Sequence, residues 1–256
     1  MRSCFVALCV MLMVLAVSSV GGASPMDSIV WQTYDTFTGS SLNTSLWSEN
    51  NSDGTLTTGT PNLTLSPTSL SGSGDNSVSI TTPYFINQGT FFAADVPFSI
   101  TSGAPGRGGA VAFDLVLQNS SSWSVIGWAN GDNVSIGGTI LNGKFFSSDS
   151  NSQTPPLILQ STSVMQGQLG LIYSGNMITL YYDDGTGWYQ IGTPNSTAGS
   201  SGPLTLEVEA DIMNSGSLTV AVPGVWVSTP PVPEPSTLLL LGSGLVGLVG
   251  WRWRRK

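Results

Sequence analysis

Three acidic residues stand at alternate positions in the segment PLTLEVEAD, namely Glu207, Glu209 and Asp211. In an extended strand, residues two apart project from the same face at intervals of about 6.5 to 7 Å, so the three carboxyl groups would form one row. Retaining glycosidases use two carboxyl groups about 5 to 5.5 Å apart, which makes this row a candidate for glycoside hydrolysis. The interpretation we favour is a solvated outer face with no catalytic residue, because unpaired carboxylates mostly stay in water.

A second set of oxygen-bearing side chains has the spacing of half a calcium loop. Glu49, Asn51 and Asp53 alternate and are followed by Gly54, as at the start of a helix-loop-helix calcium site. The twelfth position, which should supply a bidentate glutamate, is Thr60. We therefore predict a turn here and no metal site, while a structural calcium ion elsewhere stays open because the chain is acidic.

Aromatic side chains form the third candidate site. Trp188 and Tyr189 follow the turn signal Asp184-Gly185, and exposed aromatic rings can stack on the apolar face of a sugar. These two residues are our predicted ligand-binding pair. Tryptophan is largely buried in most folds, and we expect Trp47 and Trp226 to belong to the core.

The composition excludes several classes of function. The chain of 256 residues has no histidine, which rules out a histidine-based catalytic triad and a histidine-ligated zinc site. Residues 24–230 hold two basic residues, Arg107 and Lys144, and fourteen of the fifteen acids, a formal net charge of −12. Nucleic acid would be repelled, and we predict no nucleic-acid partner.

The central part of the chain reads as an all-β domain. Short apolar or alternating runs are separated by Gly, Asn, Asp and Ser, and no stretch keeps a helical apolar period. About ten strands are too many for one open sheet, which favours a two-sheet β-sandwich. The predicted strands are 76–82, 89–95, 108–118, 123–129, 157–160, 168–174, 176–183, 203–210, 217–222 and 224–228.

The amino-terminal segment has the layout of a secretory signal peptide. Arg2 precedes an apolar run from Cys4 to Val17, and small residues follow, with cleavage expected after Ala23. Cys9 is the only other cysteine in the chain, so the mature protein would contain no thiol.

The carboxyl-terminal segment has the composition of a short membrane span. Residues 236–250 carry no charge, and a helix extended through Trp253 would measure roughly 27 Å, close to the hydrocarbon thickness of about 30 Å. A basic cluster ends the chain and should stay on the cytoplasmic side, which puts the bulk of the protein outside. The cluster consists of Arg252, Arg254, Arg255 and Lys256.

The motif Val232-Pro233-Glu234-Pro235, the glycine-containing apolar helix and the terminal basic patch together resemble the PEP-CTERM sorting signal. The resemblance implies export, transient residence in the inner membrane and processing by an exosortase in exopolysaccharide-producing Gram-negative bacteria. A plain membrane anchor after a proline-rich stem is the alternative. The predicted organisation is a signal peptide at 1–23, an extracytoplasmic β-sandwich at 24–229, a proline-rich stem at 230–235, and a transmembrane helix with basic tail at 236–256.

The domain itself resembles concanavalin-A-like jelly rolls at both ends. Its opening supplies Asp35, Phe37, Leu42, Trp47 and a strand read as Asn62 to Ser66. Its end resembles the group's closing strands, in which a hairpin carries an exposed aromatic residue and the last strand returns beside the first. Glucanases of this group carry Glu-x-Asp-x-x-Glu, whereas here Ile212 stands where the second glutamate would fall.

These observations predict an exported, non-enzymatic protein of the cell surface or extracellular matrix that needs no cofactor and has polysaccharide as its candidate ligand. The first alternative is a jelly-roll glycoside hydrolase that uses Glu207, Glu209 or Asp211. The second is a purely structural matrix component that binds no glycan.

Overall fold

The computed structural model describes residues 24–59, 62–83, 86–87, 89–132, 135–136, 139–140, 143–150, 158–161, 163–196 and 203–228. The predicted signal peptide, the sorting motif at 232–235 and the basic tail lie outside these residues. Within them, no helix has both the length and the apolar character that crossing a membrane requires.

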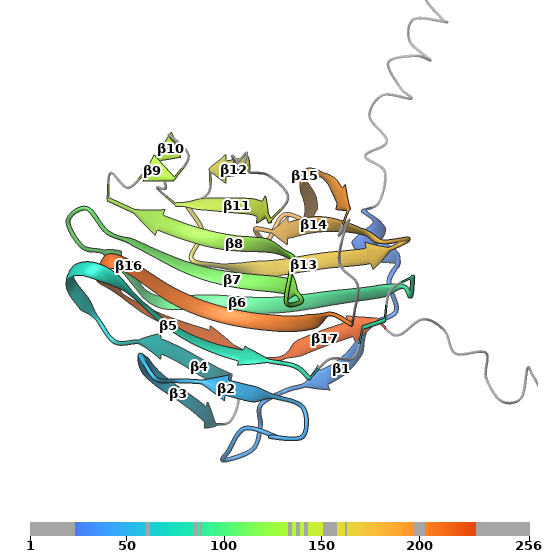
Figure 1. Ribbon diagram of the computed structural model, residues 1–256, viewed down its shortest axis with the longest axis horizontal. Helices are drawn as coiled ribbons and strands as arrows, with labels where there is room; N and C mark the ends of the chain where they lie inside the picture. The colour runs from blue at the N-terminus through green and yellow to red at the C-terminus, as the bar shows by residue number, and fades with distance from the viewer. Residues whose placement is uncertain are drawn as a thin grey trace, which may run out of the picture.

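The described chain is a two-layered, jelly-roll-like β-sandwich, which confirms the predicted fold class (Figure 1). A single 3-10 turn, η1 (Pro25–Ser28), precedes the strands. The first strands are β1 (Gln32–Asp35), β2 (Ser48–Asn50), β3 (Gly54–Gly59), β4 (Asn62–Pro67), β5 (Leu70–Thr81), β6 (Phe92–Pro105), β7 (Ala110–Gln118) and β8 (Trp123–Gly131). They are followed by β9 (Ser135–Ile136), β10 (Thr139–Ile140), β11 (Lys144–Asp149), β12 (Ile158–Ser161), β13 (Gln166–Ser174), β14 (Met177–Asp183), β15 (Trp188–Ser196), β16 (Thr205–Val222) and β17 (Val225–Ser228).

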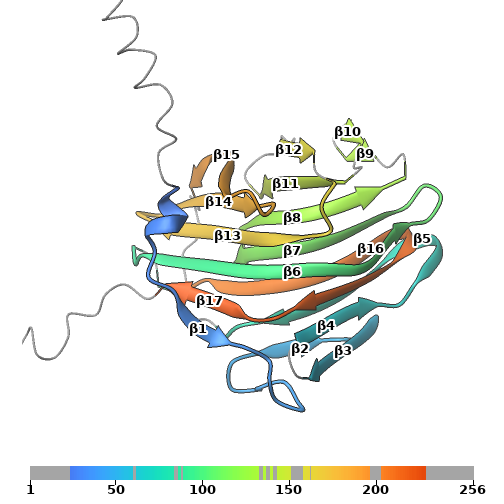
Figure 2. The same ribbon diagram turned by 180° about the vertical axis from the view of Figure 1, so that it is seen from behind.

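One layer has the strand order β12-β11-β8-β7-β16-β5-β2 and faces the viewer in Figure 1. The other layer faces the viewer in Figure 2, which shows the molecule from behind. It contains β15-β14-β13-β6 and continues from β6 through β16 to β4 and β3. β17 pairs with β6, and β1 pairs with β17. The last strand therefore lies beside the first, as the resemblance to jelly rolls predicted.

Strand β16 belongs to both layers. Its first half pairs with β5 and β7, and its second half pairs with β4 and β6. The prediction of two separate strands in this segment, 203–210 and 217–222, was wrong. The intervening residues look like a turn, but they stay in the ladder with only a register shift near Asn214, whose φ is 62°.

The core between the layers is filled by alternate residues of these strands. In β16 the even-numbered residues Leu206, Val208, Ala210 and Ile212 are fully buried there. Phe145 stacks on Tyr182 from the other layer, with 4.4 Å between the ring centroids. This alternation leaves the odd-numbered residues of β16 on the opposite face of the first layer.

The opening motif of the domain is held together by one carboxylate. Asp35 accepts hydrogen bonds from the Phe37 backbone N–H at 2.8 Å and from the Trp47 indole Nε1 at 3.0 Å. Trp47 is buried, as predicted, and contacts the Phe37 ring at a centroid distance of 5.9 Å. Trp226 is only partly buried and lies outside the core cluster, so that expectation was wrong; it projects on the outer face of its sheet, opposite Asp95.

Replacement of Asp35 by alanine should lower the free energy of unfolding by about 2 to 4 kcal/mol, because two buried or half-buried N–H donors lose their acceptor. Urea denaturation of the purified protein measures the change. Asp53→Ala is the matched control, because Asp53 is exposed and its loss should change stability by less than about 0.5 kcal/mol. Equal losses in the two variants would contradict this role of Asp35.

Candidate functional site

The predicted row of carboxyl groups exists on one face of the first layer. Glu207, Glu209 and Asp211 project from β16 opposite Thr81, Ser79 and Ser77 of β5. On the other side they lie opposite Val116, Asp114 and Ala112 of β7. Residues directly opposite in an antiparallel pair share a face, so a band of polar side chains crosses the centre of this sheet.

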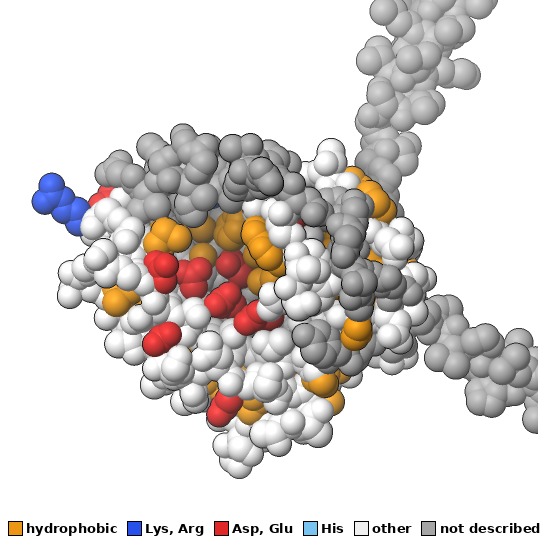
Figure 3. Space-filling view, in the orientation of Figure 1, with side chains coloured by type: hydrophobic (Ala, Val, Ile, Leu, Met, Phe, Trp, Pro, Cys, Tyr) orange, Lys and Arg blue, Asp and Glu red, His pale blue; other side chains and the backbone are white. Residues whose placement is uncertain are grey.

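This face is hollowed, and acidic side chains gather at its centre over the middle strands (Figure 3). The row lies on the face turned away from the core, as predicted, but the prediction that its side chains are fully solvated was wrong, because all three are half-buried. Burial, together with the neighbouring charges of Glu209 and Asp75, raises the pKa of Asp211 to about 7. Burial and the charge of Glu207 also raise the pKa of Glu209.

A fourth carboxyl group, which the sequence analysis did not single out, completes this cluster. Asp114 lies directly opposite Glu209, is only 9% exposed, and its Oδ1 atom has no hydrogen-bond partner among the described residues. Burial first, and then the charges of Asp211, Glu209 and Glu207, raise its pKa well above the ordinary value. The available signal was a single acid inside the apolar run AVAFDLVL.

The position of Asp114 depends on a glycine in the next strand. A Cβ atom at Gly127 would collide with Asp114 Oδ1 and would lie 2.6 Å from the Phe146 ring, so no larger residue fits beneath them. Asp114 thus leans toward β8, where an apolar wall borders the acidic centre. The wall consists of Ala110, Val116, Val125, Ala129 and Phe146.

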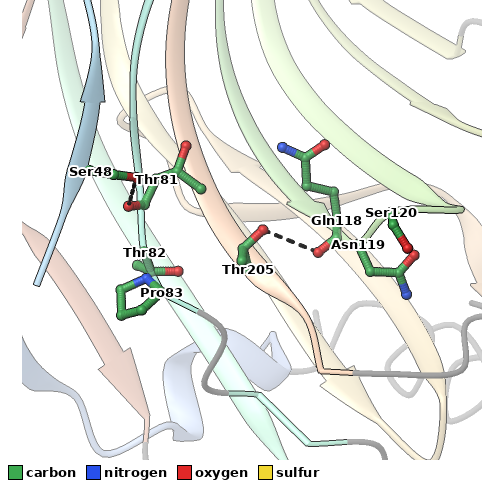
Figure 4. Close-up of a pocket in the computed structure, with 8 residues that line it drawn as sticks. All are labelled: Ser48, Thr81, Thr82, Pro83, Gln118, Asn119, Ser120 and Thr205. Carbon is green, nitrogen blue, oxygen red and sulfur yellow. Dashed lines mark hydrogen bonds between the residues drawn. The ribbon is translucent and has the colours of Figure 1, made fainter.

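A pocket of about 450 Å³, lined mainly by residues with polar side chains, opens at one end of this face (Figure 4). The Gln118 amide donates a hydrogen bond to Glu207 Oε2, which joins the pocket to the carboxyl row. The Thr205 hydroxyl donates a hydrogen bond to the backbone carbonyl oxygen of Gln118 at 3.2 Å. The lining consists of hydroxyl and amide side chains and one proline: Ser48, Thr81, Thr82, Pro83, Gln118, Asn119, Ser120 and Thr205.

An exposed tryptophan stands beside this pocket. Trp123, the first residue of β8, lies directly opposite Gln118 on the same face and is 40% exposed. Its backbone is held by the residue that follows β11, because its N–H donates to Ser150 Oγ at 3.1 Å. Trp123 was not among the predicted site residues, although it directly follows a turn and begins an apolar strand. We name the whole feature, from the pocket and Trp123 along the carboxyl row to Asp211, the acidic groove.

The side chains of the predicted ligand-binding pair, Trp188 and Tyr189, lie on opposite faces of their strand, β15, in which they are neighbours. The Trp188 ring packs with Met26 over Gly170. Tyr189 is 44% exposed and stacks on Tyr182, with 5.5 Å between the ring centroids. The two rings therefore do not form one platform.

The half calcium loop forms a turn. The Gly54 N–H donates to the Asn51 carbonyl oxygen at 3.4 Å, and the Asp53 carbonyl oxygen accepts from Thr68. In the part of the chain that the structure describes, no group of three or more acidic side chains is arranged to hold a metal ion.

Comparison of the sequence with protein families finds the PEP-CTERM protein-sorting motif at residues 231–256. This motif implies export, anchoring of the C-terminal end in the membrane, and later processing by an exosortase, a membrane protease. No curated protein matches the sequence.

Solved structures match the domain in fold. An immunostimulatory antigen and pseudo β-1,3-glucanase of Mycobacterium tuberculosis is 11% identical with a TM-score of 0.54, over 79% of this chain and 98% of that one. The CBM2 module of an evolved Dit protein from Lactobacillus casei BL23 phage J-1 is 10% identical with a TM-score of 0.53, over 78% and 94% of the two chains. The GH43 protein BlXynB of Bacillus licheniformis is 10% identical with a TM-score of 0.52, over 77% of this chain and 39% of that one.

At such identities the likeness concerns the fold alone. The chain therefore carries a PEP-CTERM sorting motif behind a jelly-roll-like β-sandwich, a fold that it shares with a CBM2 module and with glycoside hydrolase family proteins.

Proposed function

We propose that this exported protein binds polysaccharide in its acidic groove, at the cell surface or in the extracellular matrix, without cleaving it. The observation that carries the proposal is the pocket of hydroxyl and amide groups, which continues into the carboxyl row through the hydrogen bond from Gln118 to Glu207 and lies beside the exposed Trp123.

Each part of the groove suits one part of a sugar. Hydroxyl, amide and carboxylate side chains exchange hydrogen bonds with ring hydroxyl groups. The indole of Trp123 offers an apolar plane against which the carbon-bound hydrogens of a ring can pack. The groove follows β16 between β5 and β7, so a chain of several sugars could lie along the carboxyl row.

The comparisons support the setting of this function. The sorting motif implies an exported protein, and polysaccharide is the abundant polymer outside exopolysaccharide-producing bacteria. The fold is shared with a CBM2 module, although the sequence identity is only 10%. An exosortase is the expected processing partner, and we propose the released domain as the form that meets the glycan.

The binding test compares two exposed aromatic residues in the purified full-length protein. Trp123→Ala should weaken binding about tenfold, or about 1.4 kcal/mol, because it removes the stacking plane beside the pocket. Tyr189→Ala is the matched control and should bind like the unaltered protein. Isothermal titration with soluble β-1,3-glucan, chitin and chitosan oligosaccharides measures the affinities. Absence of binding to every oligosaccharide, or an equal loss in Tyr189→Ala, would overturn the proposal.

Hydrolysis is the second candidate function, and the location of the acids favours it. Glu207, Glu209 and Asp211 lie in the groove, and a pKa of about 7 would let Asp211 donate a proton near neutral pH, as a general acid does. Their spacing along the strand of about 6.5 to 7 Å exceeds the carboxyl separation of retaining enzymes and reaches the lower end of the inverting range. The second glutamate of the glucanase motif is replaced by Ile212, which is buried in the core.

An assay of reducing-sugar release from β-glucans decides between binding and hydrolysis. We expect no release above background from the unaltered protein, and the same background from Glu207→Gln. Release that is lost in Glu207→Gln but kept in the control Glu49→Gln would establish hydrolysis instead of binding alone.

A further inference from the structure

The centre of the acidic groove concentrates negative charge without a neighbouring cation. Glu207, Glu209 and Asp211 have only Thr, Ser, Val, Ala and Asp114 as cross-strand neighbours, and Asp75 faces Met213 one step further along β5. Lys144 is the one basic residue of the described part of this sheet, and it lies three strands from Asp211. At about 4.8 Å per strand, the backbones of Lys144 and Asp211 are roughly 14 Å apart.

Asp114 gives independent evidence that the groove is incomplete by itself. Buried polar atoms in folded proteins almost always have a hydrogen-bond partner. Asp114 Oδ1 is buried without one; the side chain belongs to the groove face, and this oxygen leans toward Gly127 and the Phe146 ring at the edge of the acidic centre. In its charged form a carboxyl group accepts hydrogen bonds only, so the partner that would complete the ionised Asp114 must be a donor.

The arrangement of the acids suits an extended organic cation better than a metal ion. Among the described residues no three acidic side chains converge as metal ligands, and the row instead extends along β16. An ammonium group carries three N–H donors and one positive charge, so it can bridge neighbouring carboxylates. A sugar polymer with an amine on each ring would present such groups repeatedly along its length.

We infer that the acidic groove selects glycans with free primary amines, that is de-N-acetylated amino sugars, over neutral and anionic glycans. This inference rests on the proposed function, since the hydroxyl-lined pocket and Trp123 supply the contacts to the sugar ring. The carboxylates of β16 and β7 supply the contacts to the amine. An anionic polysaccharide would meet like charge along the whole row.

The raised pKa values of three carboxyl groups in the groove support this assignment. Burial raises the pKa of Asp114, Glu209 and Asp211, so keeping them ionised costs free energy when no cation lies beside them. The groups that face them are Glu207 on the same strand, Asp75 on β5 and, further off, Lys144 on β11. An ammonium placed between these carboxyl groups would stabilise their charged forms.

The test uses two tetrasaccharides, glucosamine tetramer and N-acetylglucosamine tetramer, which differ only in their N-acetyl groups. Each is titrated into the full-length protein at low salt and at physiological salt. The amine form should bind at least tenfold more tightly at low salt, and this preference should shrink as salt screens the charges. Glu209→Gln and Asp211→Asn should each reduce the preference several-fold. Asp53→Asn removes one exposed negative charge elsewhere and should leave it unchanged.

The outcomes separate this inference from the proposed function. Equal affinity for the two tetramers, or binding of β-1,3-glucan alone, would overturn amine selectivity and leave polysaccharide binding intact. Failure to bind any glycan would overturn both. If tetralysine bound as tightly as the glucosamine tetramer, the groove would recognise positive charge without the sugar ring. That result would overturn the assignment to a glycan. Thermal unfolding of each variant shows whether it is folded. If Asp211→Asn fails to fold, the affinity ratio of Glu209→Gln for the two tetramers alone tests the amine selectivity.

Discussion

The alternation of side chains along β16 is the constraint on which the rest of the structure depends. One strand of 18 residues supplies even-numbered residues to the core and odd-numbered carboxyl groups to the groove, and it pairs with strands of both layers. A slip of one residue in its register would bury the acids in the core and expose Leu206 and Val208. The fold and the acidic groove are therefore specified by the same hydrogen-bond ladder.

The groove holds groups that a domain selected for stability alone would not keep together. Four carboxyl groups lie on adjoining strands, and one of them, Asp114, is buried without a hydrogen-bond partner. Gly127 allows this arrangement because a side chain there would collide with Asp114 and Phe146. Such local costs are typical of binding sites, where the missing interactions are completed by a ligand.

Much of the fold could be predicted from the sequence, because local patterns determine it. Alternation placed Glu207, Glu209 and Asp211 on one face, and the opening and closing segments indicated a jelly roll. Pattern alone could not tell which face is hollow, since that depends on how the sheet curves and on what packs beside it. Asp114 and Glu209 are 95 positions apart in sequence, and only the register of β7 against β16 makes them neighbours. Trp188 and Tyr189 failed as a platform for the same reason that the acids succeeded, because adjacent strand residues point to opposite faces.

The central claim is that ligand binds on the hollow face that β16 forms with β5 and β7. Amide hydrogen exchange of the full-length protein, with and without a bound oligosaccharide, measures where binding occurs. Our account predicts slower exchange at 75–81, 112–118 and 205–211, with the β14–β15 hairpin unchanged. Protection confined to that hairpin, at 177–196, would contradict it.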